Sequence, residues 1–157
     1  VREDVLKGAY YLIDYRGYAG YEPGDNVVNI FALGSPATEA IKASQELLQK
    51  GIYANVIVVT CTDLLVGNLA HEDGYAHLRY GLGISADLYL KPTSGADINT
   101  LAGRRIPIVS VADGETGLLD NLGSIVGTRQ ETLGVRKHSR CGRPTDIYKY
   151  HHIDHGK

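Results

Sequence analysis

Methionine and tryptophan are absent from this 157-residue sequence, and cysteine occurs only twice. Two cysteines are too few for the disulfide framework on which small secreted proteins depend. No apolar run approaches the roughly 20 residues that a membrane-spanning helix needs, and we expect no secretory signal. These absences favour a cytoplasmic protein and argue against a membrane partner.

The chain also lacks a large net charge, because its 16 basic and 18 acidic residues nearly cancel and leave a net charge of -2. That balance offers no overall attraction to nucleic acid or to an anionic membrane. The hydrophobic share of 43% is ordinary for a globular protein, and the length suits one compact domain over residues 1–157. The chain starts at Val1, as a processed chain or an excised domain would.

The aromatic residues are one phenylalanine, Phe31, and eleven tyrosines. Tyrosine combines an apolar ring with a polar hydroxyl, which suits a surface that becomes half-buried against a partner. A strand edge and loop with solvated hydroxyls explains the same residues, so both interpretations stay open. The tyrosines gather near the start of the chain, at Tyr10, Tyr11, Tyr15, Tyr18 and Tyr21.

The clearest local unit is a strand, a helix and a second strand. Residues 27–33 form an apolar, β-branched run that predicts a buried strand, and 55–60 predict another. Between them, Ser35 suits the N-cap, Pro36 the first helical position and Gly51 a left-handed cap at the helix end. In such a βαβ unit the two strands are parallel. The helix is expected to turn Ala40, Ile41, Ser44, Leu47 and Leu48 inward, and Glu39, Lys42, Glu46 and Lys50 outward.

Shorter elements are predicted around this unit. Residues 71–103 are rich in glycine and mixed in polarity, which favours short helices joined by loops. From about residue 144 the sequence becomes a polar, histidine-rich tail. Further strands are predicted at 9–13, 106–112 and 132–135, and further helices at 62–69, capped by Thr62 or Asp63, and at 117–125.

The spacing of Gly81, Gly83 and Ala86 resembles that of a dinucleotide-binding glycine loop. Such a loop follows an apolar strand, so that the backbone can turn sharply beneath the pyrophosphate. Residues 76–80 do not form an apolar run, so we expect an ordinary loop here.

Two polar turns follow predicted strands. Gly34 and Ser35 open a helix, where free N–H groups attract anions, but capping alone explains the pair. Asp113 and Glu115 place two carboxylates after the strand at 106–112. A general acid–base pair is one interpretation, and we favour the other, in which Asp113 caps the next helix and Glu115 lies in its first turn.

Residues with metal-ligand chemistry gather near the carboxy terminus. Their spacing is looser than that of a structural zinc site, so we predict no metal site. The group consists of His138, Cys141, His151, His152 and His155.

The two cysteines differ in their surroundings. Cys61 follows an apolar strand and is expected to be a small core residue. Arg140 and Arg143 flank Cys141, which makes it a candidate reactive thiol, because nearby cations favour the thiolate.

Residues 129–143 carry five cations against one acid, Glu131. This segment suits an anionic ligand, an acidic partner surface or salt links between domains, and a solvated basic loop explains it equally well. The candidate anion or partner surface consists of Ser35, Arg136, Lys137, His138, Arg140 and Arg143.

In their order, these segments resemble the carboxy-terminal domain of the transketolase and 2-oxo acid dehydrogenase family. The combination is a strand, a Gly-Ser turn, an amphipathic helix, a Gly-Ile-Tyr-Ala turn and a second strand, all within 27–60. Residues 118–143 look like the homodimeric decarboxylating component of pyruvate dehydrogenase complexes. A divergent segment at about 66–105 and the polar tail lie outside the likeness. Further matching segments are 8–12, 63–65, 108–114 and 133–135.

The resemblance implies a three-layer α/β/α fold with a mostly parallel sheet of about five strands and one antiparallel edge strand. It also implies that thiamine diphosphate and Mg²⁺ bind to other domains of a longer enzyme. The family's Gly-Asp-Gly motif is not matched, because Ala112 replaces its first glycine and Asn121 follows too closely. We therefore expect no catalytic residue and no cofactor site in this chain.

Three hypotheses of function follow. The favoured one is an assembly or dimerisation domain of a thiamine-diphosphate-dependent enzyme, with the cofactor-binding domains, a second copy in a homodimer and an acyltransferase core as partners. The alternative is a stand-alone regulatory module that binds an anionic metabolite or a partner through the basic loop. A third is an independent enzyme with a metal at His138 and Cys141.

Overall fold

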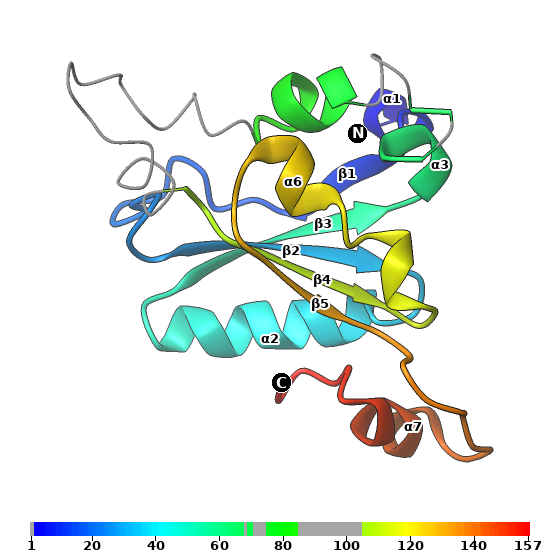
Figure 1. The fold of residues 1–157 in the computed structure, drawn as a ribbon. Helices are drawn as coiled ribbons and strands as arrows, with labels where there is room; N and C mark the ends of the chain where they lie inside the picture. The colour runs from blue at the N-terminus through cyan, green and yellow to red at the C-terminus, as the bar shows by residue number, and fades with distance from the viewer. Residues whose placement is uncertain (1, 68, 71–74, 85–104) are drawn as a thin grey trace.

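The structure, a computed structural model, describes residues 2–67, 69–70, 75–84 and 105–157. Its centre is a five-stranded sheet in the order β1-β3-β2-β4-β5 (Figure 1). The strands are β1 (Ala9–Ile13), β2 (Val27–Leu33), β3 (Tyr53–Val59), β4 (Ile108–Ala112) and β5 (Gln130–Leu133).

Strand directions confirm the predicted sheet. β2 pairs in parallel with β3 on one side and with β4 on the other, and β4 pairs in parallel with β5. Among the strands of the described residues, β1 alone runs antiparallel, at the edge beside β3. The fold is therefore α/β, with a mostly parallel sheet and one antiparallel edge strand.

Helices cover both faces of the sheet (Figure 1). The long helix α2 (Ala37–Gln49) lies on one face, and α7 (Pro144–His151) lies near it. In the described part of the chain no helix is both long and apolar enough to cross a lipid bilayer. The opposite face carries α1 (Arg2–Leu6), α3 (Thr62–Leu65), the π-helical turn η1 (His77–Gly81) and α6 (Leu122–Val126), and a 3-10 turn, η3 (Thr116–Leu118), follows β4.

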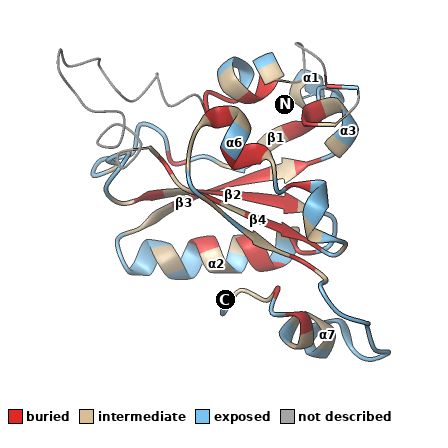
Figure 2. Cartoon of the chain, in the orientation of Figure 1, coloured by how far each residue is buried: buried red, intermediate tan, exposed pale blue. Residues whose placement is uncertain are grey.

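The core has two parts because neighbouring residues of a strand point to opposite faces of the sheet. Phe31 of β2, fully buried, packs with Leu122 on the face that carries α6. Its neighbour Ile30 packs with Ala40 of α2 and with Ile153 on the other face. Figure 2 shows the resulting band of buried residues along the central strands. Burial on both faces explains why residues 27–33 are almost continuously apolar.

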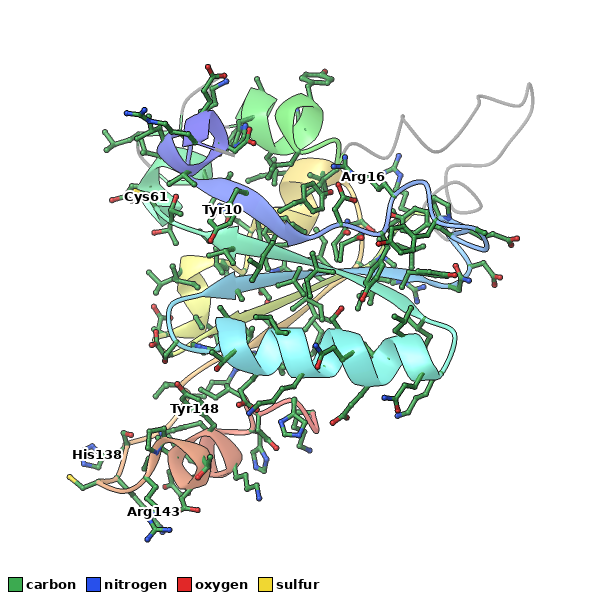
Figure 3. All side chains as sticks on the ribbon, turned by 180° about the vertical axis from the view of Figure 1, so that it is seen from behind. Tyr10, Arg16, Cys61, His138, Arg143 and Tyr148 are labelled. Carbon is green, nitrogen blue, oxygen red and sulfur yellow. The ribbon has the colours of Figure 1, made fainter. Side chains whose placement is uncertain are left out.

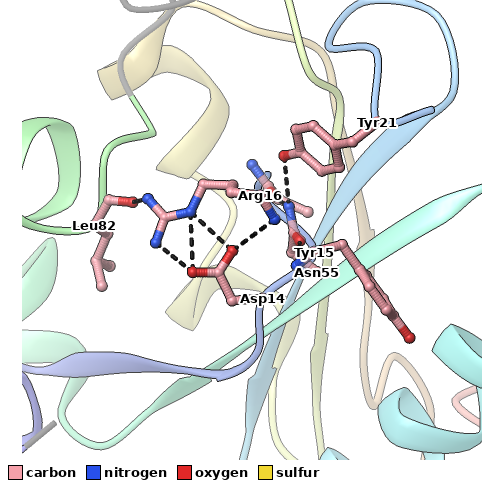
Figure 4. Close-up of polar contacts among 7 residues, drawn as sticks. Asp14, Tyr15, Arg16, Tyr21, Asn55 and Leu82 are labelled. Atoms are coloured by element: carbon pink, nitrogen blue, oxygen red, sulfur yellow. Dashed lines mark hydrogen bonds and ion pairs between the residues drawn. The ribbon is translucent and has the colours of Figure 1, made fainter. Parts of the chain in front are cut away.

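A buried amide connects the tyrosine-rich segment to the sheet (Figure 4). The side chain of Asn55 is 1% exposed. Its oxygen accepts a hydrogen bond from the Tyr15 backbone at 2.9 Å, and its nitrogen donates to Asn29 at 2.9 Å and to the Tyr21 hydroxyl at 3.0 Å. Tyr15 is buried, whereas Tyr18, whose ring contacts it edge-on, is 59% exposed. The tyrosines thus include both core and surface residues.

Several predicted boundaries move by a few residues. β4 starts two residues late, after Pro107, which has no N–H to donate. The second strand of the βαβ unit begins at Tyr53, and the last strand occupies 130–133 instead of 132–135. The helix predicted at 62–69 ends at Leu65, and the one at 117–125 divides into η3 and α6.

The largest correction concerns the carboxy-terminal segment. The sequence predicted a polar tail, but residues 144–151 form α7, and Ile153 is 2% exposed within the core. Glu39 was expected to face outward and is 7% exposed, because this segment covers it. Leu48, expected to face inward, is 40% exposed. Most of 71–103 lies outside the described residues.

Candidate functional site

The carboxyl ends of β2 and β4 form the point of the sheet where an α/β protein usually binds a ligand. From β2 the chain continues through α2 on one face, and from β4 it continues through α6 on the other. Such a reversal leaves a crevice between the two strand ends. Ser35 follows β2 and Asp113 follows β4, so the two polar turns predicted from sequence meet here.

These turns bond to each other. The Ser35 hydroxyl donates to Asp113 Oδ2 at 2.6 Å, and the Ser35 N–H donates to the same oxygen at 3.2 Å. The Tyr148 hydroxyl, from α7, donates to the Ser35 oxygen at 2.6 Å. Gly34 has a φ of +78°, and a Cβ there would lie 2.7 Å from Asp113 Oδ1. The polar groups of the two turns are thus paired with each other and with Tyr148.

This network corrects two capping predictions. Ser35 is not the N-cap of α2: Pro36 holds that position with a φ of -63°, and no side chain caps the helix. Asp113 does not cap the following turn, because it accepts from Ser35. Glu115 does so instead, since its side chain accepts from the Gly117 N–H at 3.2 Å.

The basic loop at 136–143 is held against α7 by Tyr150. The Lys137 ammonium lies 3.7 Å and the Arg140 guanidinium 4.4 Å from the centre of the Tyr150 ring. Cations are attracted to the negative face of an aromatic ring. Arg136 donates to the Thr132 carbonyl at 2.8 Å. These contacts give the loop a defined shape without neutralising its charge.

Within the described ranges, no ion pair joins any of the cations of this loop to a carboxylate. Arg136, Lys137, His138, Arg140 and Arg143 are all exposed. Figure 3 shows His138 and Arg143 at the outer end of the loop, away from Tyr148. The Ser35 hydroxyl is bonded to Asp113 and Tyr148.

The histidines do not converge. His151 is 7% exposed, with Nε2 3.0 Å from the Ser139 hydroxyl, and it lines a cavity of about 300 Å³ between β5 and α7. His155 lies instead against α2, beside Glu39. His138, Cys141 and His152 are exposed. Across the part of the chain that the structure describes, no group of three His, Cys, Asp or Glu side chains is arranged so that it could hold a metal ion.

The structure also tests the predictions for Cys61 and for the glycine motif that begins at Gly81. Cys61 is not a core residue, because it is partly exposed at the start of α3. Residues 77–81 form a helical turn, not a strand, so Gly81 lacks the context of a dinucleotide-binding loop. Ser85 and Ala86 of that motif lie outside the described residues.

Sequence reasoning missed Tyr148, Tyr150 and Ile153. One signal was present, because Pro144 suits the start of a helix, and Ile147, Tyr148 and His151 follow at helical spacing. The high polarity of the segment concealed it.

Comparison with known proteins shows a likeness of fold. No known family profile matches the sequence, and a search of curated proteins finds no relative. Transketolase from Leishmania mexicana aligns with 98% of this chain at 18% identity and a TM-score of 0.59, over 17% of its own length. Transketolase from Campylobacter jejuni aligns with 98% at 14% identity and a TM-score of 0.56, over 18% of its length. The chain thus spans less than one fifth of those transketolases, and the likeness shows a transketolase-like α/β fold.

Proposed function

We propose that this chain is the carboxy-terminal assembly domain of a thiamine-diphosphate-dependent enzyme, either a pyruvate dehydrogenase-type decarboxylating component or a transketolase. The supporting observation is that 98% of the chain matches a domain-sized part, 17–18%, of transketolase chains. The resemblance in sequence covers the same strands and the same Gly-Ser turn. In this role the domain contributes contact surface, and the other domains carry out the reaction.

The pyruvate dehydrogenase type is favoured by residues 118–143, which resemble it. They occupy one continuous unit: the crossover from β4 to β5, and the basic loop that leads to α7. The parent reaction would then be the decarboxylation of a 2-oxo acid. An acyltransferase core is the partner that we propose for the exposed basic loop.

The cofactor itself is assigned to the other domains. Asp113 is the residue nearest in context to the family's cofactor motif, yet it accepts two hydrogen bonds from Ser35. Ala112 stands where the motif has a glycine. These residues do not fit a site for Mg²⁺ and a diphosphate, so we assign no catalytic step to this chain.

The homodimer contact is proposed at the β1 edge of the sheet. β1 is the outermost strand beside β3, and edge strands offer backbone groups to a partner. Leu12 on this strand is 44% exposed, and Tyr18 in the following loop is 59% exposed. An apolar and tyrosine-rich edge has the composition of a protein interface.

An antibody raised against this chain tests the proposal in the source organism. We expect an immunoblot to detect a polypeptide several times larger than 17.0 kDa. That polypeptide, once purified, should be dimeric and should bind thiamine diphosphate with Mg²⁺. Calorimetry on the 157-residue chain alone should show no saturable binding of the cofactor. A native protein of the size of this chain, or stoichiometric cofactor binding by it, would disprove the proposal.

A regulatory module is the second candidate, favoured by the unpaired charge of the basic loop. Lys137 and Arg140 are oriented by Tyr150 and have no carboxylate partner among the described residues. A thermal-shift screen of phosphorylated metabolites tests this role. A ligand that stabilises the chain by several degrees, and fails with Arg136→Ala but not with the exposed Arg129→Ala, would favour the module. The absence of any such ligand would reject it.

A further inference from the structure

A cavity lies between β5 and α7, at the outer edge of the sheet. Its volume is about 300 Å³, which suits a small molecule. Glu131 and Thr132 of β5 line one side, and His151 of α7 lines the other. Arg136 and Lys137 of the basic loop complete the wall. Two cations against one carboxylate give the cavity a net positive charge.

The edge of β5 supplies a backbone donor to this cavity. The Ile108 N–H donates to the Arg129 carbonyl at 2.9 Å, so the Arg129 carbonyl faces β4. Backbone groups alternate in direction along a strand, so those of Thr132 face away from β4, on the open edge. The hydrogen bond from Arg136 to the Thr132 carbonyl, at 2.8 Å, agrees with this direction. The Thr132 N–H therefore points to the same side as the Arg136 guanidinium.

One ring nitrogen of His151 lacks a hydrogen-bond partner. The residue is 7% exposed, and its Nε2 lies 3.0 Å from the Ser139 hydroxyl. Its Nδ1 is buried and bonds to no group of the described residues. Buried polar atoms nearly always have a partner, so an unpaired one beside a cavity indicates a missing group. Because a hydroxyl can donate to Nε2, Nδ1 can carry the proton of a neutral ring and act as a donor.

The charge and the number of donors decide which anion fits best. Among the described residues, neither Arg136 nor Lys137 forms an ion pair with a carboxylate. A phosphate monoester carries a charge of about -1.5 to -2 at neutral pH and offers three strong acceptor oxygens. A carboxylate offers one charge and two oxygens. Two cations, the Thr132 N–H and the His151 ring match the phosphate group better.

We propose that this cavity binds the phosphate group of a small phosphate monoester. Arg136 and Lys137 neutralise the group, the Thr132 N–H donates to one of its oxygens, and His151 Nδ1 donates to another. The ligand joins the edge of the sheet to α7 and so stabilises the carboxy-terminal segment. The inference deepens the second candidate function, the regulatory module, on which its regulatory meaning rests. It does not depend on the assembly role.

NMR titration of the isotope-labelled 157-residue chain with inorganic phosphate tests the site. At neutral pH and constant ionic strength, we expect a saturable shift of the Thr132 amide signal, with half-saturation on the order of 1 mM. The ring nitrogens of His151 should report a proton on Nδ1 in the bound form. Glycerol phosphate, a small monoester, should bind at least as tightly as inorganic phosphate.

Two arginines of the same loop provide a matched comparison. Arg136→Ala should weaken phosphate binding about tenfold, because it removes a hydrogen bond between charged groups. Arg143→Ala removes the same charge from a residue outside the lining of the cavity, and it should change the affinity less than about twofold. Lys137→Ala is a second variant in the cavity and should weaken binding as Arg136→Ala does. Unchanged amide signals elsewhere show that each variant is folded.

Three outcomes would overturn the site. The first is a Thr132 signal that does not respond saturably to either phosphate compound. The second is equal weakening by Arg136→Ala and Arg143→Ala, which would assign the binding to the loop surface and leave the regulatory module without this cavity. The third is binding of inorganic phosphate with exclusion of glycerol phosphate. None of them bears on the dimer or on the cofactor, which the measurements on the native polypeptide test separately.

Discussion

The hydroxyl of Tyr148 donates a 2.6 Å hydrogen bond to the side chain of Ser35, 113 residues earlier in the sequence. Ser35 in turn donates to Asp113, so one relay of hydrogen bonds joins α7, the start of α2 and the end of β4. The relay lies at the point of the sheet where α/β proteins often bind ligands, and it uses the polar side chains of both turns.

Removal of the Tyr148 hydroxyl tests how much this relay stabilises the fold. In Tyr148→Phe we expect the free energy of unfolding in urea to fall by about 0.5–1.5 kcal/mol, the usual net value of one hydrogen bond. Tyr150→Phe is the matched control: its hydroxyl lies 3.5 Å from the His138 carbonyl, and its ring still faces Lys137. The control should lose little stability. Equal losses in the two variants would contradict the assigned role of Tyr148.

We predict that a side chain at position 34 lowers the stability of the fold for two reasons that can be measured separately. In Gly34→Ala the backbone remains at a φ of +78°, which costs about 1–2 kcal/mol for a residue with a side chain. The new methyl also meets Asp113 Oδ1 at 2.7 Å. We expect a loss above the backbone cost alone in urea unfolding. In an Asp113→Ala background the second part should disappear. If the two substitutions are additive, there is no steric conflict between these residues.

Acid titration should reveal the contribution of Glu39. Burial would raise the pKa of Glu39, but hydrogen bonds from Lys42 and His155 outweigh it and lower the pKa from the ordinary 4.5 to about 2, so the ionised form stabilises the fold. That contribution is fully present above about pH 4.5 and is lost as the pH falls toward 2. Glu39→Gln removes it, at a cost of about 1–3 kcal/mol at pH 6. The stability difference between wild type and variant should therefore shrink during acidification. A difference that is constant from pH 6 to 3 would refute the lowered pKa.

The predictable part of the fold lies where local pattern and burial agree. Residues 27–33 are apolar because β2 is covered on both faces, and the helical spacing of Ala40 and Ser44 follows from one buried stripe. The sheet and the long helix could therefore be read from the sequence. The basic loop was also recognisable, since its charge is local, and all of its predicted cations are exposed.

The remaining features depend on contacts between distant residues. Glu39 resembles any outward-facing glutamate until His155, 116 residues later, reaches it. Ser35 is a residue type that often caps a helix, but in the structure its hydroxyl donates to Asp113 and accepts from Tyr148 instead. No pattern within one helix or turn contains this information. The sequence therefore identified residues of the candidate site, but it did not identify the side chains to which they bond.

Asn55 offers the strictest test of the buried network, because a single atom change introduces a charge. Asn55→Asp keeps the oxygen that accepts from Tyr15 but loses the amide that donates to Asn29 and Tyr21. A carboxylate at a site only 1% exposed has no cation to pair with among these contacts. We expect a loss of about 3–5 kcal/mol at pH 7 in urea unfolding.

The pH dependence of this variant has a defined sign. Burial raises the pKa of a carboxyl group above its value in the unfolded chain, so the folded variant binds a proton that the unfolded one has released. The deficit relative to wild type should therefore shrink as the pH falls from 7 toward 5. Gln49→Glu adds the same charge at an exposed position of α2 and should change stability by less than about 0.5 kcal/mol at either pH. A deficit in Asn55→Asp that is independent of pH would mean that the new carboxylate reaches water, and that the network which connects the tyrosine-rich segment to β3 opens readily.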